Sequence, residues 1–371
     1  MCEIITKEFL LEIAIIFVKI GILFGAVMAL AGILTWAERK MSALMQDRVG
    51  PNRASIFGFS LWGLFHPAAD GIKMVAKEDF VPDKADKVLF TLAPMLALVP
   101  VFVILAFIPF GDYLQIGNLK IQLQISDLPL SLFLFLAISS LAIYGAFLGG
   151  WSAKNNFGLL GAVRAAAQMI SYEVVLGLTL VGIILVYGSG SIQEIVKKQG
   201  EMLFGFLPSW GIVYQFPAFI LFLVAAVAEN KRTPFDIVEG ESEIIGYFVE
   251  YSSMRFAMFM FSEFAEIVVV SMIASALFLG GWQVPFLNET GFAFPGGILI
   301  TINHNIVALI QTTAFAGKTV FMAWLLLLIR WTLPRFRFDQ LMKLCWKGLL
   351  PLSLANIVLT SAILQWLGSG K

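Results

Sequence analysis

Five carboxylates lie within one short stretch, RTPFDIVEGESEIIGYFVEY at positions 232–251. They are Asp236, Glu239, Glu241, Glu243 and Glu250, with Arg232 at the start and Arg255 just beyond the end. Three more acids, Glu173, Glu263 and Glu266, interrupt apolar runs elsewhere in the chain. Acids that are clustered in a medium of low dielectric constant share protons. Such a cluster can act as a proton relay.

The composition predicts an integral membrane protein around these acids. The chain has 371 residues, of which 59% are hydrophobic and 13% charged, and its mean hydropathy is +0.87. A soluble domain is about 25% charged. An ionised acid at the bilayer centre costs roughly 2.5–3.5 kcal/mol, so all these glutamates facing lipid would cost about 20 kcal/mol. We therefore expect them to face one another, basic side chains or enclosed water.

Apolar segments predict an all-α, polytopic protein with eight transmembrane helices. They cover residues 13–36, 88–110, 129–150, 170–188, 216–228, 255–282, 310–332 and 346–367. Most Lys and Arg residues fall in the loops 37–87, 151–169, 229–255 and 330–347. Because basic loops stay in the cytoplasm, both termini should lie on the non-cytoplasmic side. We expect one transmembrane domain over 1–371, with no tandem repeat.

The first cytoplasmic loop, 37–87, holds a second charged set. Asp70 and Lys73 can pair at i,i+3 spacing on a cytoplasmic-side amphipathic helix. Its apolar face would hold Leu61, Leu64, Phe65, Ala68, Ile72 and Val75. Glu38 and Arg39 stand where the first apolar segment ends. These charges are either an interfacial anchor with a solvated salt bridge, or the charged lip of a cavity that is entered from the membrane.

The sequence shows no redox cofactor of its own and no basis for nucleic-acid binding. Cys2 and Cys345 are too few for an iron–sulfur cluster, which needs about four ligands. His66 and His304, the only histidines, are expected on opposite sides of the membrane, which argues against a haem. The net charge is +0. No G-x-G-x-x-G follows a strand, so a nicotinamide cofactor would bind elsewhere.

The order of several short motifs resembles that of one family over about residues 10–365. The motifs are ERK, RVGPNR, ADGIK, GAVRAAAQMISYE, TPFD, EGESE, EYSSMRF and LPRFRFDQLM. The chain is similar in this respect to the H subunit of bacterial NADH:quinone oxidoreductase, respiratory complex I. The resemblance implies a multi-pass protein in the bacterial inner (plasma) membrane that lines a quinone chamber. FMN and iron–sulfur clusters would then lie in partner subunits of the same complex, and quinone would be the substrate.

The resemblance also implies roles for individual residues. The quinone-side set would be Glu38, Arg39, Arg48, Asp70 and Lys73. The proton pathway would use Glu173, Glu239, Glu241, Glu243, Glu250 and Glu263, with Arg164, Arg232, Asp236 and Arg255 beside it. Glu266 is the weakest candidate, because it could simply flank a polar face. Taken singly, each acid could also be a solvated loop acid or a partner of Arg232 or Arg255.

Several positions depart from the family pattern. His66 stands where Gln is usual, Lys231 where Asn is usual, and Asn156–Phe157 where Lys-Tyr is usual. The interval from Glu243 to Glu250 is one residue shorter than the family has, which on a helix is a rotation of about 100°. The role of Glu250 is therefore less firmly implied than those of its neighbours.

Two other functions fit the residues. One is the homologous membrane subunit of a membrane-bound hydrogenase or formate hydrogenlyase, which works without a quinone. The other is an independent cation or proton transporter, which inverted repeats and paired broken helices would support. The sequence shows neither of those features.

Overall fold

The computed structural model describes residues 2–117, 119–203, 206–237, 246–288, 290–294 and 298–368. Within these residues, seven helices are long and apolar enough to cross a membrane. They are α1 (Cys2–Met45), α3 (Lys87–Ile104), α4 (Ser131–Ser152), α5 (Asn156–Tyr187), α9 (Ser253–Phe278), α10 (His304–Thr332) and the continuous helix made of α11 (Phe338–Lys343), the π-helical turn Leu344–Leu349 and α12 (Leu350–Gly368). The prediction of an all-α polytopic membrane protein is confirmed.

The fifth predicted segment forms a shorter helix, α8 (Phe216–Glu229), of 14 residues. At 1.5 Å per residue it is about 21 Å long, less than the roughly 30 Å of a bilayer core. The four-residue helix α7 (Gly211–Tyr214) precedes it. The bend between them falls at Gln215, whose backbone is not helical, and Pro217 lies at the first turn of α8. The fifth predicted segment is therefore present as a short helix preceded by a bend, and it is not among the seven described helices of spanning length.

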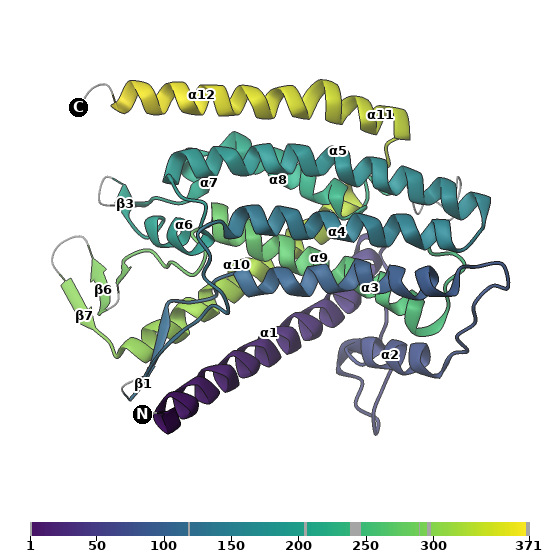
Figure 1. Cartoon of the computed structure of the whole chain (residues 1–371), viewed down its shortest axis with the longest axis horizontal. Coiled ribbons are helices and arrows are strands. Elements are labelled where there is room, and N and C mark those ends of the chain that lie inside the picture. The colour runs from purple at the N-terminus through teal and green to yellow at the C-terminus, as the bar shows by residue number, and fades with distance from the viewer. Residues whose placement is uncertain are drawn as a thin grey trace.

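The long helices run side by side, and both chain termini lie at the same end of the bundle (Figure 1). Helix α9 packs against α1, α3 and α10, while α5 packs against α4, α8 and α12. Every residue of α9 from Ile267 to Phe278 is buried. Helix α1 crosses the bundle obliquely, and its residues 9–22 are largely exposed. The core of the bundle therefore forms around α5, α8 and α9.

The end that carries the termini also carries the short strands (Figure 1). Strands β1 (Tyr113–Ile116) and β2 (Leu119–Gln122) form a hairpin, as do β3 (Met202–Leu203) and β4 (Leu207–Pro208). Strands β5 (Leu287–Asn288), β6 (Gly291–Phe294) and β7 (Ile298–Thr301) form a three-stranded antiparallel sheet. The short helix α6 (Ile192–Lys198) follows α5. The described parts of the long connectors at this end thus carry short strands, which the sequence did not predict.

The opposite end carries the amphipathic helix α2 (His66–Ala76). It begins five residues later than the apolar pattern predicted, so Leu61, Leu64 and Phe65 lie outside it. The reason is local, because Trp62 and Gly63 have positive φ angles of 55° and 86°. A Cβ atom on Gly63 would come within 1.9 Å of the Pro51 carbonyl oxygen, so this close turn requires glycine.

The second basic loop is also shorter than predicted. Helix α5 begins at Asn156 with the Asn155 side chain capping the Phe157 amide, so residues 156–169 are helical rather than loop. The small residues Gly161, Ala162 and Ala165 are buried and let neighbouring segments approach α5 closely. Both Arg164 and Glu173 consequently lie on this one 32-residue helix.

Candidate functional site

An exposed group of three charges joins α1 to α2. Nη2 of Arg39 lies 2.6 Å from Oδ2 of Asp70, and Nζ of Lys73 lies 3.2 Å from Oδ1. We call Arg39, Asp70 and Lys73 the α2 lip. Partial burial raises the pKa of the Asp70 carboxyl, but the hydrogen bonds and charges of Arg39 and Lys73 outweigh it and hold the pKa below its ordinary value. The predicted pairing of Asp70 with Lys73 is present.

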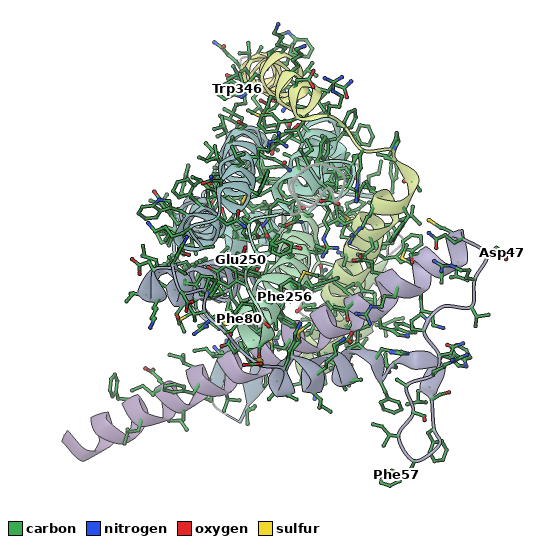
Figure 2. The ribbon with its side chains drawn as sticks, turned by 90° about the vertical axis from the view of Figure 1, so that its right-hand side faces the viewer. Asp47, Phe57, Phe80, Glu250, Phe256 and Trp346 are labelled. Atoms are coloured by element: carbon green, nitrogen blue, oxygen red, sulfur yellow. The ribbon has the colours of Figure 1, made fainter. Side chains whose placement is uncertain are left out.

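Arg48, the fifth member of the predicted quinone-side set, is not part of this lip. It lies past the end of α1, is exposed and donates a hydrogen bond to Gln46. Figure 2 shows the loop that follows, with Phe57 at its tip pointing away from the bundle. The Phe57 side chain is 99% exposed.

Glu38 points the other way from its neighbour Arg39. Successive residues on a helix are rotated by about 100°, so adjacent side chains of α1 face different surroundings. Oε2 of Glu38 lies 2.8 Å from Nη1 of Arg232, and Oε1 accepts a hydrogen bond from Arg330 of α10. The Glu38 side chain is 12% exposed, against 49% for Arg39. Glu38 was predicted in the quinone-side set together with Arg39, and in the structure its side chain is directed to the interior of the bundle.

Arg232 continues this contact into the centre of the bundle. Its Nη2 lies 3.9 Å from Oε2 of Glu263 on α9, and its guanidinium stacks over the Phe264 ring at 4.4 Å. Nζ of Lys231 lies 3.7 Å from the other oxygen of Glu263. We call Glu38, Lys231, Arg232, Glu263 and Arg330 the buried ion cluster.

Lys231 is 5% exposed and donates a hydrogen bond of 2.9 Å to the hydroxyl of Tyr247. Burial lowers the pKa of the Lys231 ammonium, but the nearby Tyr247, Glu263 and Glu266 outweigh burial and raise the pKa above its ordinary value. The ammonium therefore stays charged at neutral pH. The cluster holds three cations and two carboxylates, so each acid in it has at least two basic neighbours.

Asp236 forms a separate pair at the edge of the cluster. Its Oδ2 accepts a hydrogen bond of 3.0 Å from Arg335 in the loop between α10 and α11. The same loop docks on the TPFD stretch, because the Phe336 amide donates to the Pro234 carbonyl and the Phe336 ring stacks on Phe235 at 5.5 Å. The loop between α10 and α11 thus contacts the TPFD stretch through an ion pair, a backbone hydrogen bond and a ring stack.

A third group of acids borders a small cavity. Glu229, at the end of α8, and Glu266, on α9, both line it together with apolar residues of α3, α4 and α9. The cavity leaves about 20 Å³ of space for the centre of a water molecule, which is enough for one water. Glu229 is 5% exposed, and among the described residues its Oε2 has no hydrogen-bond partner. A bound water would satisfy that oxygen.

Glu173, on α5, extends this group because its hydrogen-bond partner lies on α4, which also lines the cavity. Glu173 accepts a hydrogen bond of 2.6 Å from Ser140 of α4. Glu229 was not singled out in the sequence, although it is an acid directly after the apolar run FPAFILFLVAAVA. Its position after this apolar run and shortly before the TPFD motif was the sequence feature that could have identified it as a candidate. Glu266, predicted as the weakest member, lies beside it at the cavity.

The other predicted residues lie nearer the edge of the bundle. Oε1 of Glu250 accepts a hydrogen bond of 2.7 Å from Asn155, and Figure 2 shows Glu250 over the body of the bundle when it is viewed from the α2 end. Arg255 pairs with Asp79 at 3.3 Å. The Arg164 guanidinium lies 5.7 Å from the centre of the Phe338 ring. None of these contacts joins Glu250 to the buried ion cluster.

Glu239, Glu241 and Glu243 lie outside the described residues. Within the described residues, no group of three or more His, Cys, Asp or Glu side chains could hold a metal ion.

Comparisons with known proteins agree with the resemblance seen in the motifs. A model of the family described as NADH dehydrogenase matches residues 18–361. The chain is 41% identical to the NADH-quinone oxidoreductase H subunit numbered 1 of Cytophaga hutchinsonii, over 96% of this chain and 98% of that protein. It is 44% identical to the H subunit of Thermomicrobium roseum over 93% and 94% of the two chains. It is also 43% identical to the H subunit numbered 1 of Geobacter metallireducens over 96% and 98%.

Proposed function

The chain belongs to the family of NADH-quinone oxidoreductase H subunits, and from that premise we propose that its charged groups link a quinone site at α2 to a proton path inside the bundle. As a member of this family it is a membrane-arm subunit of complex I and part of an oxidoreductase. Its own contribution in this proposal is to bind quinone at the membrane entrance and to respond to quinone reduction.

Two adjacent side chains of α1 point in opposite directions, and this observation supports the proposal most directly. Arg39 pairs with Asp70 in the exposed α2 lip, and Glu38 pairs with Arg232 and Arg330 in the buried ion cluster. Arg39 of the α2 lip and the buried carboxylate of Glu38 therefore belong to adjacent residues of one helix. A change in the net charge at the lip would act on that carboxylate over a short distance. Reduction of a quinone to a quinol takes up two electrons and two protons, and such a change shifts the electrostatic balance of nearby ion pairs.

The lip residues Arg39, Asp70 and Lys73 suit the entrance of the quinone site. They are charged but partly exposed, and they lie between α1 and the amphipathic helix α2. Arg48 contributes at most to the outer surface of this entrance, since its described contact is with Gln46. The lip would orient the polar quinone head while its apolar tail stays in the membrane.

The buried acids suit the start of the proton path. Glu263 lies between Lys231 and Arg232, and Glu229 and Glu266 border the cavity deeper between α3, α4, α8 and α9. Glu173 extends the group to α5. Glu239, Glu241 and Glu243 remain predicted members that would connect the cluster to the quinone, and Glu250 with Arg164, Asp236 and Arg255 would flank the path.

The proposal places this chain beside other subunits. Electrons would reach the quinone from FMN and iron–sulfur clusters in peripheral partner subunits, because quinone reduction needs an electron donor. Small membrane-arm subunits, quinone and membrane lipid complete the set of partners. The complex would lie in a bacterial inner membrane with the α2 end toward the cytoplasm, as the Lys and Arg residues of the loops indicate.

The test is a Glu263→Gln substitution in the intact complex in isolated membranes. Gln keeps the size of the side chain but can neither carry charge nor give up a proton. We expect NADH:quinone reductase activity to fall at least about tenfold, while NADH:ferricyanide activity, which bypasses the quinone, stays unchanged. The amount of assembled complex is measured in the same membranes.

Glu194→Gln is the matched control, because Glu194 lies at the opposite end of the bundle and its described side-chain bond is accepted from the Ser189 hydroxyl. Wild-type quinone reduction in Glu263→Gln would contradict the proposal. If wild-type membranes reduced no added quinone with NADH, a hydrogenase-type subunit would be favoured instead. A lone chain that transports cations after reconstitution would favour the transporter.

A further inference from the structure

A larger cavity lies at the other end of the bundle, far from the charges described above. It has a volume of about 380 Å³ and lies among the end of α5, the segment from α6 to α7, and α12. Its walls are of two kinds. Lys198, Glu201, Ser209 and Tyr214 give one polar side, and Ile363, Leu364 and Leu367 of α12 give an apolar side.

The polar side holds one cation and one anion. Lys198 is exposed, and its ammonium donates a hydrogen bond to the Tyr187 carbonyl, which uses one of its three donors. Glu201 is exposed as well, and no ion pair between it and Lys198 occurs among the described residues. The two charges are therefore available to an occupant that carries both signs.

The walls around these charges are held in place. The Tyr187 hydroxyl donates a hydrogen bond of 2.7 Å to the Ser209 carbonyl, which ties the end of α5 to the chain before α7. Gln215 fixes α12, because its amide donates to Thr360 at 2.7 Å and its oxygen accepts from Asn356 at 2.9 Å. The cavity is thus formed by segments that are bonded to one another, and it does not need an occupant to keep them apart.

The cavity lies where two helices of spanning length end, which is where lipid headgroups are expected. Helix α5 ends at Tyr187 and α12 at Gly368, so the polar side lies where two membrane-crossing helices end. Tyr214 is 41% exposed at this level, and Trp366 is 76% exposed on α12. Such aromatic side chains are enriched at membrane–water interfaces. From there the apolar side chains of α12 lead toward the middle of the membrane.

We propose that this cavity binds a glycerophospholipid with a zwitterionic, primary-amine headgroup. Lys198 contacts the phosphate, Glu201 contacts the ammonium, and an acyl chain lies along Ile363, Leu364 and Leu367. A phospholipid matches the combination of two opposite charges with a continuous apolar wall. A purely anionic headgroup would meet the carboxylate of Glu201 without compensation, and a quaternary amine has no N–H to donate to it.

The test uses the intact complex reconstituted in nanodiscs that contain phosphatidylethanolamine, phosphatidylcholine and phosphatidylglycerol in equal amounts. A photoactivatable analogue of each lipid is crosslinked in turn, and labelled peptides of this chain are quantified by mass spectrometry. We expect the ethanolamine analogue to label peptides of α12 and of residues 198–214 most strongly. Excess glycerophosphoethanolamine, which has the headgroup without the acyl chains, should not reduce the labelling.

Two variants separate the roles of the charges. Lys198→Ala should reduce labelling by the ethanolamine lipid about tenfold, the loss expected for one charge-assisted hydrogen bond. Glu201→Gln should abolish the preference for ethanolamine over glycerol headgroups. Lys197→Ala is the matched control, since Lys197 neighbours Lys198 but lies 3.9 Å from Asp112 and does not line the cavity.

Equal labelling of these peptides by all three lipids in the wild-type complex would overturn the proposal. So would unchanged labelling in both Lys198→Ala and Glu201→Gln, or a map of the intact complex in which a segment of another subunit fills the cavity. Because no step of quinone reduction is involved, these outcomes are independent of the proposed function.

Discussion

Glu38 and Arg39 are adjacent in sequence, yet they belong to two regions that differ in the exposure of their ion pairs to solvent. The α2 lip pairs Arg39 with a carboxylate at the surface, where Arg39 is 49% exposed. The buried ion cluster encloses Glu38 with Arg232, whose side chain is 9% exposed. The types of residue are the same in both regions. The side chains of Glu38 and Arg39 leave α1 in different directions, so that one is buried and the other exposed. Burial sets how much each ion pair contributes to the free energy of unfolding.

The difference has an energetic meaning. Exposed ion pairs contribute roughly 0–1 kcal/mol, because water and salt screen them. Removing one partner of a buried pair costs about 3–5 kcal/mol, because it leaves an uncompensated charge. A buried ion cluster is not required for stability, because apolar residues of similar volume often give an equal or greater free energy of unfolding. The proposed role in moving charge would explain why the cluster is nevertheless present.

The largest effect is expected from Arg232→Gln. It removes the guanidinium that contacts both Glu38 and Glu263. We expect a loss of about 2–4 kcal/mol in the free energy of unfolding of this subunit, because the charge-assisted hydrogen bond to Glu38 and the stacking on Phe264 are lost while Arg330 and Lys231 still neutralise the two acids. The loss should be seen as a lower temperature of thermal inactivation and less assembled complex. The measurement is the amount of complex on native gels together with its inactivation temperature.

The double variant Glu38→Gln with Arg232→Gln serves as the control for that result. It also removes the carboxylate that Arg330 contacts, so it should assemble no better than Arg232→Gln alone. A double variant that assembles better than the single one would show that Arg330 does not neutralise Glu38 once Arg232 is gone.

A smaller effect is expected from Lys231→Asn, which introduces the residue usual in the family. The change removes a contact of 3.7 Å to Glu263 and a hydrogen bond to Tyr247, but it leaves Arg232 as a second cation. We expect a loss of about 1–3 kcal/mol in stability. Because the pKa of Lys231 is raised, its stabilising charge is present at every pH below the ordinary lysine value, so the loss should be constant across neutral pH. Thermal inactivation at several pH values checks this, and a loss that disappears below pH 8 would contradict it.

Asp70→Asn should change stability by about 1 kcal/mol or less, because the pair is exposed. Its effect should be on quinone reduction, with a rise in the KM for quinone. The pKa of Asp70 is lowered, so the pair is present above the ordinary carboxyl range and is lost only as the pH falls through the lowered value. The ratio of wild-type to variant activity should therefore stay flat between about pH 5 and 8. If the ratio changed near neutral pH, a group other than Asp70 would be responsible for the titration.

Arg48→Gln should have the smallest effect, within about 0.5 kcal/mol on stability, as for surface substitutions in general. Arg48 is exposed and its described contact is with Gln46. Steady-state kinetics with a water-soluble quinone should give wild-type values. A clear loss of quinone affinity would place Arg48 back in the quinone-side set and extend the α2 lip along the loop.

The sequence predicted the elements that depend on composition. Apolar segments marked the crossing helices, and the i,i+3 spacing of Asp70 and Lys73 predicted their pair. It did not predict the inward direction of Glu38, because a tripeptide at a helix end does not reveal how the helix is rotated against its neighbours. It also missed Glu229, whose importance depends on the packing of α8 against α5, and the extension of α5 over residues 156–169.

The most direct test of the central claim is a double-mutant cycle between Glu38→Gln and Glu263→Gln, read as NADH:quinone reductase activity of the assembled complex. Both carboxylates contact Arg232, so the account predicts that they act as one unit. Each single variant should lose quinone reduction while keeping ferricyanide reduction, and the double variant should be no slower than the slower single variant. Losses that multiply in the double variant, or wild-type activity in either single variant, would contradict the account.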